Sequence, residues 1–174
     1  MSGKKKLENV FAGRNYIYLM HLSYGTWTEE DREEHWSYAK DKSLIGLDLP
    51  REVNKDWNEL SSSEKQSLRS RRPNWFSHFE MFCNEMKVED LVVAVSGQKS
   101  FLGVGELART KYEYRKELSR NEIFFDHVRR VNWLIARDYD DRIQLPTPLA
   151  GFDRTLLKVK PDTRFWRILS SVTL

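Results

Sequence analysis

Aromatic residues with basic neighbours are the side chains of this sequence whose types and spacing could do chemistry. Tyr112 and Tyr114 lie between Lys111 and Arg115, and Trp75 follows two arginines and a proline. Aromatic rings can stack on bases while neighbouring cations hold phosphates. Rings that face each other can also clasp a methylated group by cation–π attraction. A single ring could equally cap one end of the core, but the coincidence of several rings with cations favours a ligand surface.

No recognisable catalytic set accompanies these rings. Gly103-Val104-Gly105 lacks the third glycine of a dinucleotide-binding loop, and the Lys-Ser/Thr pair of a phosphate loop is absent. Cys83 lies on an apolar helical stripe and is interpreted as a small core residue. His21 and His35 have no partner at metal-ligand spacing, and the acidic cluster at 138–141 is interpreted as an exposed loop. We therefore expect no enzymatic activity, no cofactor and no metal site.

The composition is that of a single folded domain. The chain has 174 residues, of which 40% are hydrophobic and 13% aromatic, enough for a real core. Twenty-nine basic and 26 acidic residues give a net charge of +3, which permits nucleic-acid binding without demanding it. The longest apolar runs are too short for a membrane helix or a signal peptide, and the single cysteine allows no internal disulfide. We expect a cytoplasmic protein with no membrane partner.

The elements that must position the rings are short strands and helices. Runs rich in β-branched and aromatic residues predict strands at 15–23, 44–47, 90–95, 101–107 and 127–135, the third and fourth forming a hairpin. Helices are predicted from the N-cap Thr28 to Lys40, after Ser61-Ser62-Ser63-Glu64, and over 75–85. Residues 155–159 suit either a helical turn or a strand. Five or six short strands with a few helices suggest a small, strongly curved sheet or barrel of the α+β class.

The expected organisation is one domain over residues 15–170, preceded by a flexible basic stretch at 1–14. The polar segment at about 50–73 is interpreted as a helical insertion. Gly103 and Gly105 lie on one face of their strand, where glycines mark tight packing or a ligand close to the backbone.

Four segments carry a family resemblance in their order and spacing. They are Phe82–Val93, Phe101–Leu107, Lys111–Tyr114 and His127–Leu134. The first resembles the "EMK-V-x-D-hydrophobic" turn of EVE domains, with Glu89 where the family usually has glycine. The second and third resemble the Gly-hydrophobic-Gly-Glu strand and the aromatic loop that follows it. The last is similar to the family's "H-x-R-x-V-x-W-L" strand.

The resemblance implies a PUA-like (EVE/YTH-like) curved β pseudo-barrel flanked by helices, and a reader of nucleic acid. Several relatives hold a modified base in an aromatic pocket. Carried onto this sequence, the pocket would take the ends of two strands and the aromatic loop, with Ile45 where the family has a Trp. Its expected residues are Ser23, Tyr24, Trp27, Ile45, Gly46, Leu47, Asp48, Tyr112 and Tyr114.

The function expected from these features is recognition of a flipped, methylated base in DNA, without catalysis. EVE-like and YTH-like domains also occur at the N-terminus of McrB-type restriction GTPases. The resemblance therefore implies the specificity domain of a modification-dependent restriction system, tethered to an AAA+ GTPase and a nuclease subunit. An RNA-binding PUA-like domain is the second hypothesis, and a methyl-lysine or protein interaction module is the third. The basic residues expected on phosphates are Arg71, Arg72, Lys99, Lys111 and Arg115.

Overall fold

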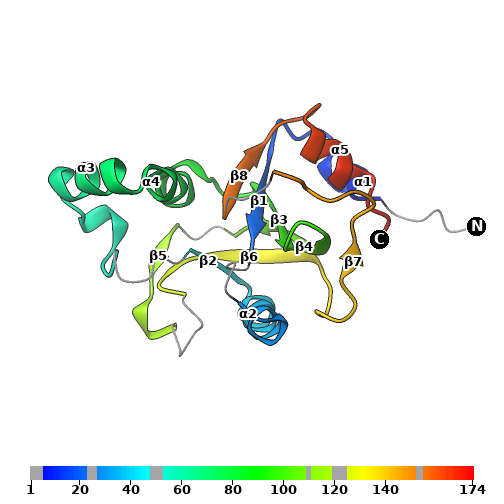
Figure 1. The fold of residues 1–174 in the computed structure, drawn as a ribbon, viewed down its shortest axis with the longest axis horizontal. Coiled ribbons are helices and arrows are strands. Elements are labelled where there is room, and N and C mark those ends of the chain that lie inside the picture. Colours follow the sequence, from blue (N-terminus) through cyan, green and yellow to red (C-terminus); the bar gives the residue numbers. More distant parts are fainter. Residues whose placement is uncertain (1–5, 23–26, 48–52, 109–110, 119–124, 152–154) are drawn as a thin grey trace, which may run out of the picture.

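The fold is mixed α+β, with a strongly curled, half-barrel sheet between helices (Figure 1). The computed structural model describes residues 6–22, 27–47, 53–108, 111–118, 125–151 and 155–174. The main path of the sheet has the strand order β2-β6-β4-β3-β1-β8, while β5 pairs with β6 and β7 with β4. The predicted curved sheet of five or six strands flanked by helices is confirmed at this level of description.

The observed elements follow the predicted ones closely. The strands are β1 (Ile17–His21), β2 (Leu44–Leu47), β3 (Leu91–Ser96), β4 (Ser100–Leu107), β5 (Glu113–Tyr114), β6 (His127–Ala136), β7 (Ile143–Gln144) and β8 (Leu156–Val159). The α-helices are α1 (Leu7–Phe11), α2 (Glu29–Lys42), α3 (Ser62–Arg71), α4 (Pro73–Glu80) and α5 (Arg164–Ser170). Shorter helical turns are η1 (Trp57–Glu59), η2 (Met81–Glu85, a π-helical turn) and η3 (Lys116–Leu118). Of residues 155–159, which suit either a helical turn or a strand, 156–159 form the strand β8.

Two helices begin where their capping residues predict. The Thr28 side chain accepts a hydrogen bond from the backbone N–H of Asp31, and the Asp31 carboxylate accepts one from the backbone N–H of Thr28. Ser61 and Glu64 make the same reciprocal pair at the start of α3. Such capping boxes satisfy backbone donors that a helix terminus otherwise leaves unpaired.

The sheet curls because its ladders contain irregularities. Register shifts occur in the β3–β4 ladder between Ala94 and Val95, and in the β4–β6 ladder between Val104 and Gly105. Shifts of this kind bend a strand and increase its twist. Gly105 lets β4 and β6 pack closely at the second of these shifts. A Cβ on Gly105 would lie 2.3 Å from Cγ1 of Val131 in β6. Tight packing, the first of the two predicted reasons for these glycines, therefore accounts for Gly105.

The two faces of the sheet bury separate cores. Along β1, Ile17 and Leu19 belong to one core and Tyr18 and Met20 to the other, as the two-residue period of a strand requires. The first core lies under α1 and α5, and the second lies under α2, α3 and α4. Figure 1 places these helices on either side of the strands. A strand that is covered on both faces is apolar at nearly every position, which explains why five consecutive residues of β3, Leu91 to Val95, are apolar.

The expectation of a flexible stretch at 1–14 is wrong for the helix α1. Leu7 and Phe11 are buried, and the ring of Phe11 packs against that of Trp166 in α5 with centroids 5.2 Å apart. Lys6 forms a β-bridge with Thr173, so both ends of the described chain are joined. The composition of this segment is basic, but its two large apolar residues lie at helical spacing and fill the core. Residues 1–5 lie outside the described part of the chain.

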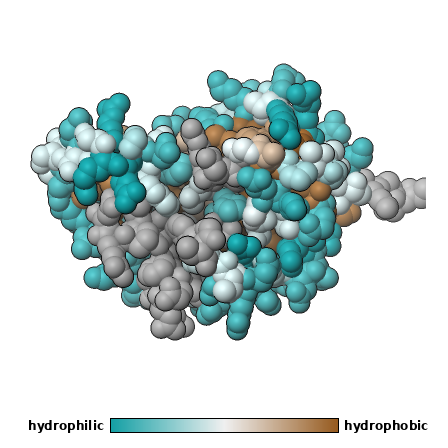
Figure 2. Space-filling model, in the orientation of Figure 1, coloured by the Kyte–Doolittle hydropathy of each residue, from teal (hydrophilic) through white to brown (hydrophobic). Residues whose placement is uncertain are grey.

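The surface seen in Figure 2 is mainly hydrophilic, and hydrophobic residues reach it chiefly around α1 and α5. Within the described ranges, no helix is both long and apolar enough to cross a membrane.

Candidate functional site

A buried polar network holds Tyr112 in place. Its hydroxyl accepts a hydrogen bond from the backbone N–H of Trp57 at 3.0 Å and lies 2.7 Å from Nδ1 of His127. The other ring nitrogen of His127, Nε2, lies 3.0 Å from the carbonyl oxygen of Val53. Because a carbonyl can only accept, Nε2 carries the proton and Nδ1 accepts from the Tyr112 hydroxyl. Every polar atom of this network is satisfied, which fixes the ring of Tyr112 between η1 and β6.

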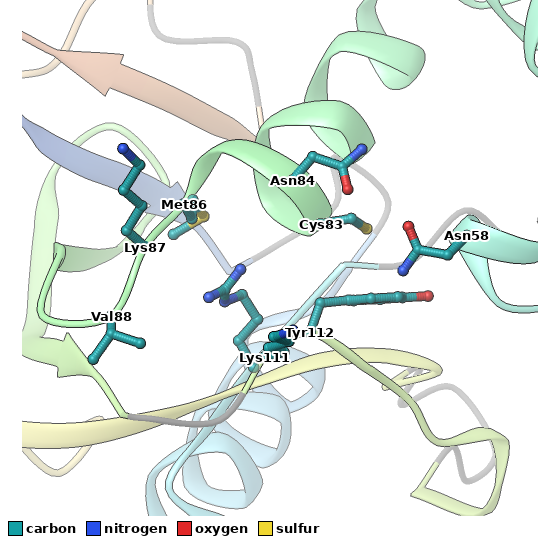
Figure 3. A pocket seen from close by; sticks show the side chains of 9 residues that line it. Asn58, Cys83, Asn84, Met86, Lys87, Val88, Lys111 and Tyr112 are labelled. Carbon is teal, nitrogen blue, oxygen red and sulfur yellow. The ribbon is translucent and has the colours of Figure 1, made fainter.

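A cavity of about 580 Å³ opens beside Tyr112. This volume lies within the roughly 300–1,000 Å³ typical of small-molecule sites. Figure 3 shows the end of η2 and the turn that follows it on one side, with Lys111 and Tyr112 opposite them. The lining side chains are Asn58, Cys83, Asn84, Met86, Lys87, Val88, Lys111, Tyr112 and Arg129.

Arg129, in β6, is the most unusual of the lining residues. Only 4% of its surface is exposed, and its Nη1 donates a 3.0 Å hydrogen bond to the carbonyl oxygen of Phe82. Its Nε is buried without a hydrogen-bond partner, and no carboxylate among the described residues forms an ion pair with it. Burial lowers the pKa of this guanidinium below its ordinary value. The negative charge of Asp90 opposes this shift without forming an ion pair with Arg129. A buried cation that forms no ion pair is costly, and such groups are typical of functional sites.

The rest of the cavity is positive and partly apolar. Lys87 and Lys111 are exposed, and none of the described lining side chains is acidic. Burial raises the pKa of the Cys83 thiol, and the negative charges of Asp56 and Glu80 raise it further, so the thiol is neutral at physiological pH. A neutral thiol is a poor nucleophile, in line with its interpretation as a packing residue. The cavity is thus suited to an anionic or hydrogen-bond-accepting ligand.

The predicted base pocket is only partly assembled. The side chains of Ile45 and Leu47 are fully buried in the core under α2 to α4, and a Cβ on Gly46 would lie 2.4 Å from the ring of Phe125. Ile45, Gly46 and Leu47 therefore form no wall of the cavity, contrary to expectation, because β2 is covered on both faces. Phe125, which the resemblance did not point to, fills the space beside Gly46.

The remaining predicted pocket residues are scattered. Trp27 packs against the ring of His35 with centroids 4.8 Å apart. The hydroxyl of Tyr114 donates a hydrogen bond to the carbonyl oxygen of Asn54, and its ring packs against that of His127. Tyr112 alone lines the cavity. Ser23, Tyr24 and Asp48 lie outside the described residues.

The predicted phosphate contacts do not form one surface either. Lys111 lines the main cavity, whereas Lys99 lines a second cavity of about 410 Å³ at the β3–β4 turn. Arg115 is held by ion pairs with Glu113 and Glu117. Arg71 and Arg72, at the end of α3, are exposed. Among these five residues, Lys111 is the one that the structure brings to the cavity.

Sequence reasoning did not point to Arg129 and Lys87 as residues that line the cavity. Both lie in segments that carry the resemblance, Arg129 as the Arg of "H-x-R" and Lys87 as the Lys of "EMK". The signal that could have pointed to Arg129 is its charge, because a charged residue between the apolar residues of a predicted strand is unusual. The burial of Arg129 depends on Phe82, 47 residues earlier in the chain, and no local pattern reports that contact.

Among the described residues, no group of three or more His, Cys, Asp or Glu side chains is arranged to hold a metal ion.

The second cavity, beside the β3–β4 turn, is lined by ion-paired side chains. The hydroxyl of Tyr139 donates to Glu29 at 2.8 Å, and Glu29 pairs with Arg32 and Arg142. These ion pairs occupy both arginines, so this cavity is less suited to an anion than the first.

The stability of the fold is expected to fall in mild acid because of His35. Its ring lies between those of Trp27 and Phe125, and burial lowers its pKa from 6.5 to about 3. The unfolded chain therefore binds the proton first. Stability is complete above about pH 6.5 and falls by up to about 1.4 kcal/mol per pH unit as the pH drops from there towards 3. Burial also lowers the pKa of His127, which adds to the slope in the same direction.

Urea unfolding of the wild type and of His35→Phe at pH 7, 6 and 5 measures this slope. The variant keeps an aromatic ring in the stack and removes the titrating group. It should show a shallower dependence on pH than the wild type, and identical slopes would contradict the assignment.

Comparison with known proteins finds one family. The model of a family described as a domain of unknown function (DUF8426) matches residues 18–149. These residues include all of β1 except Ile17, the strands from β2 to β7, and every residue that lines the cavity. A search of curated proteins finds no match.

Proposed function

The chain belongs to the family of the domain of unknown function DUF8426, and we propose that it is a nucleic-acid recognition domain that takes an unpaired base of DNA into the Arg129 cavity. The observation that carries the proposal is the buried guanidinium that forms no ion pair with a described carboxylate, in a cavity flanked by two exposed lysines. The lysines would hold the phosphates on either side of the base, and the guanidinium would hold its edge. Stacking on aromatic rings returns about 1–3 kcal/mol per base, against the few kcal/mol that extrusion costs.

Two features support a PUA-like, EVE-related domain. The sheet is strongly curled and flanked by helices, as such a pseudo-barrel requires. Glu89, which stands where EVE domains usually have glycine, has a φ of 68°. This left-handed backbone conformation suits glycine best, so the turn has the geometry that the family's residue would favour.

The chemistry of the cavity favours nucleic acid over a methyl-lysine ligand. A methyl-lysine carries a positive charge, which Arg129, Lys87 and Lys111 would repel. A methylated base is accommodated instead, because Met86 and Val88 give the cavity an apolar side for a methyl group. Together with the resemblance to domains of McrB-type GTPases, this supports a role as the specificity domain of a modification-dependent restriction system.

The lysine pair provides the test of this function. We expect Lys87→Gln/Lys111→Gln to weaken binding to every oligonucleotide by a similar factor. The slope of log Kobs against log salt should become shallower by about two, since each lost phosphate contact removes about one. Fluorescence anisotropy at several salt concentrations measures both quantities. The probes are matched duplexes that are unmodified or carry N6-methyladenine, 5-methylcytosine or 5-hydroxymethylcytosine, with an RNA of equal sequence.

Lys160→Gln is the matched control, since this exposed lysine lines none of the described cavities. It should leave affinity and salt slope close to those of the wild type. Wild-type protein that binds none of the probes at low salt would refute the proposed function. A double variant that behaves like Lys160→Gln would refute the cavity as its site. Tighter binding of the RNA than of any duplex would identify an RNA-binding domain instead.

A further inference from the structure

We propose, building on the function above, that one side of α3 is a second contact with the nucleic acid. This side carries Ser62, Lys65 and Arg69, and it holds the phosphates of the duplex arm on one side of the unpaired base. The cavity then takes the base, while α3 fixes the direction in which the duplex lies across the protein. None of the three residues is among the phosphate contacts expected from the sequence.

The three side chains form a row along the helix. They occupy positions i, i+3 and i+7 of α3, a spacing that places side chains on one face. Ser62 and Arg69 are exposed, and Lys65 is half-buried. At about 1.5 Å per residue the row is roughly 10 Å long, which is close to the rise of three base pairs. Its length therefore suits about three consecutive phosphates of one strand, which serine hydroxyls and cations both bind.

Aromatic rings hold the two cations of this row in place. Nζ of Lys65 lies over the ring of Trp57 at 5.0 Å, and the guanidinium of Arg69 lies over the ring of Phe76 at 5.6 Å. The two rings pack against each other with centroids 5.6 Å apart. A cation–π contact positions a cation without neutralising its charge. The two charges are therefore ordered before a ligand binds, which lowers the entropic cost of binding.

The charge of the row is not neutralised within the described chain. No carboxylate of a described residue forms an ion pair with either cation of the row. Residues 65–79 contain four Lys or Arg residues and no Asp or Glu. Glu64, which precedes this stretch, pairs with Lys55. Glu80, which follows it, accepts a hydrogen bond from the indole of Trp57. A surface of this charge fits a polyanion such as the phosphate backbone.

The row is continuous with the cavity through η1. Asn58, in η1, lines the cavity, and the ring of its neighbour Trp57 lies under Nζ of Lys65. Burial raises the pKa of the Cys83 thiol in the cavity, and the charge of Lys65 is one of those that oppose this rise. Figure 1 shows α3 at one end of the molecule, away from α1 and α5. A duplex whose unpaired base enters the cavity therefore reaches α3 with one arm only.

Neutral methylphosphonate linkages separate this contact from the cavity. The first probe is a duplex with one unpaired cytosine. In two further probes a block of linkages is neutral on one side of the cytosine or on the other, while the linkages next to it stay charged for Lys87 and Lys111. For the wild type we expect one block to weaken binding about tenfold at low salt and to make the salt slope shallower by about two. The other block should have little effect. Fluorescence anisotropy at several salt concentrations measures both quantities.

Lys65→Gln/Arg69→Gln removes the two charges of the row. It should bind the fully charged probe as weakly as the wild type binds the sensitive one, and neither block should weaken it further. Because α3 contacts only the backbone, the variant should lose the same factor with an abasic duplex. Lys160→Gln/Arg164→Gln is the matched control, since these two exposed cations line none of the described cavities. It should behave like the wild type.

The block series on the wild type needs no variant, so a misfolded double variant does not remove the test. Equal effects of the two blocks, or no effect of either, would overturn the inference and leave a nucleic-acid-binding function in place. A folded double variant with the salt slope of the wild type would do the same, and would leave α3 to a partner other than nucleic acid. Absence of binding to any probe would overturn the proposed function as well.

Discussion

Trp57→Ala is expected to lower the free energy of unfolding by about 3–5 kcal/mol, the range for removing a large buried aromatic side chain. Trp57 is fully buried, and its ring stacks on Phe79 with centroids 5.0 Å apart. Its Nε1 donates to Glu80 at 3.2 Å, and Lys65 lies over the ring at 5.0 Å. Trp57 therefore packs the polar segment that contains η1 and α3 against the core. Urea unfolding at pH 7 measures the change.

The loss of Trp57 should also weaken ligand binding. Its backbone N–H donates to the hydroxyl of Tyr112, so movement of η1 releases the ring that lines the cavity. Trp166→Ala is the matched control: Trp166 packs on Phe11 in the opposite core and should leave binding unchanged. A change below about 1 kcal/mol for Trp57→Ala would mean that the segment is not anchored as described.

Arg129→Met is expected to reduce affinity for an oligonucleotide with an unpaired base by about 10- to 100-fold, since a hydrogen bond from a charged donor is worth roughly 1.5–3 kcal/mol. The same variant should raise the free energy of unfolding by about 1 kcal/mol. The gain arises because methionine removes a buried charge without a carboxylate partner. The unpaired carbonyl of Phe82 that remains limits it.

Thermal unfolding and anisotropy on the same protein preparation measure the two effects together. Opposite changes in stability and affinity identify Arg129 as a residue retained for binding. A loss of stability of about 2 kcal/mol or more would identify it as a structural residue instead, because the guanidinium would then support the fold through its bond to Phe82.

The sequence predicts those elements whose determinants are local. Thr28 and Ser61 cap their helices as expected because each capping box lies within four residues of chain. The β3–β4 hairpin follows from two apolar runs joined by a short polar turn. Local signals of this kind also placed β1, β2 and β6.

The site depends on contacts that are distant in the sequence, and these were not predictable. Ile45 and Leu47 end up in the core because β2 is covered from both sides, which its short apolar run does not reveal. Arg129 is buried through a contact with η2, and Tyr112 is fixed by Trp57, 55 residues earlier. In the helix α1, Leu7 and Phe11 are buried against α5 at the other end of the described chain. In each case the tertiary partner, and not the local pattern, decides the environment of the side chain.

The Nε–Hε NMR signal of Arg129 tests most directly whether the cavity is where nucleic acid binds. The signal can be assigned by its absence from the spectrum of Arg129→Lys, and it reports the one donor of this residue that is buried without a partner. A ¹⁵N-labelled wild-type sample would be titrated with the duplex that carries an unpaired cytosine, and separately with the abasic duplex. We predict a large shift that saturates with the cytosine probe, at the affinity found by anisotropy, and a much smaller shift with the abasic probe. An Arg129 signal that stays unchanged at saturation, while backbone amides elsewhere shift, would contradict the assignment of this cavity as the binding site.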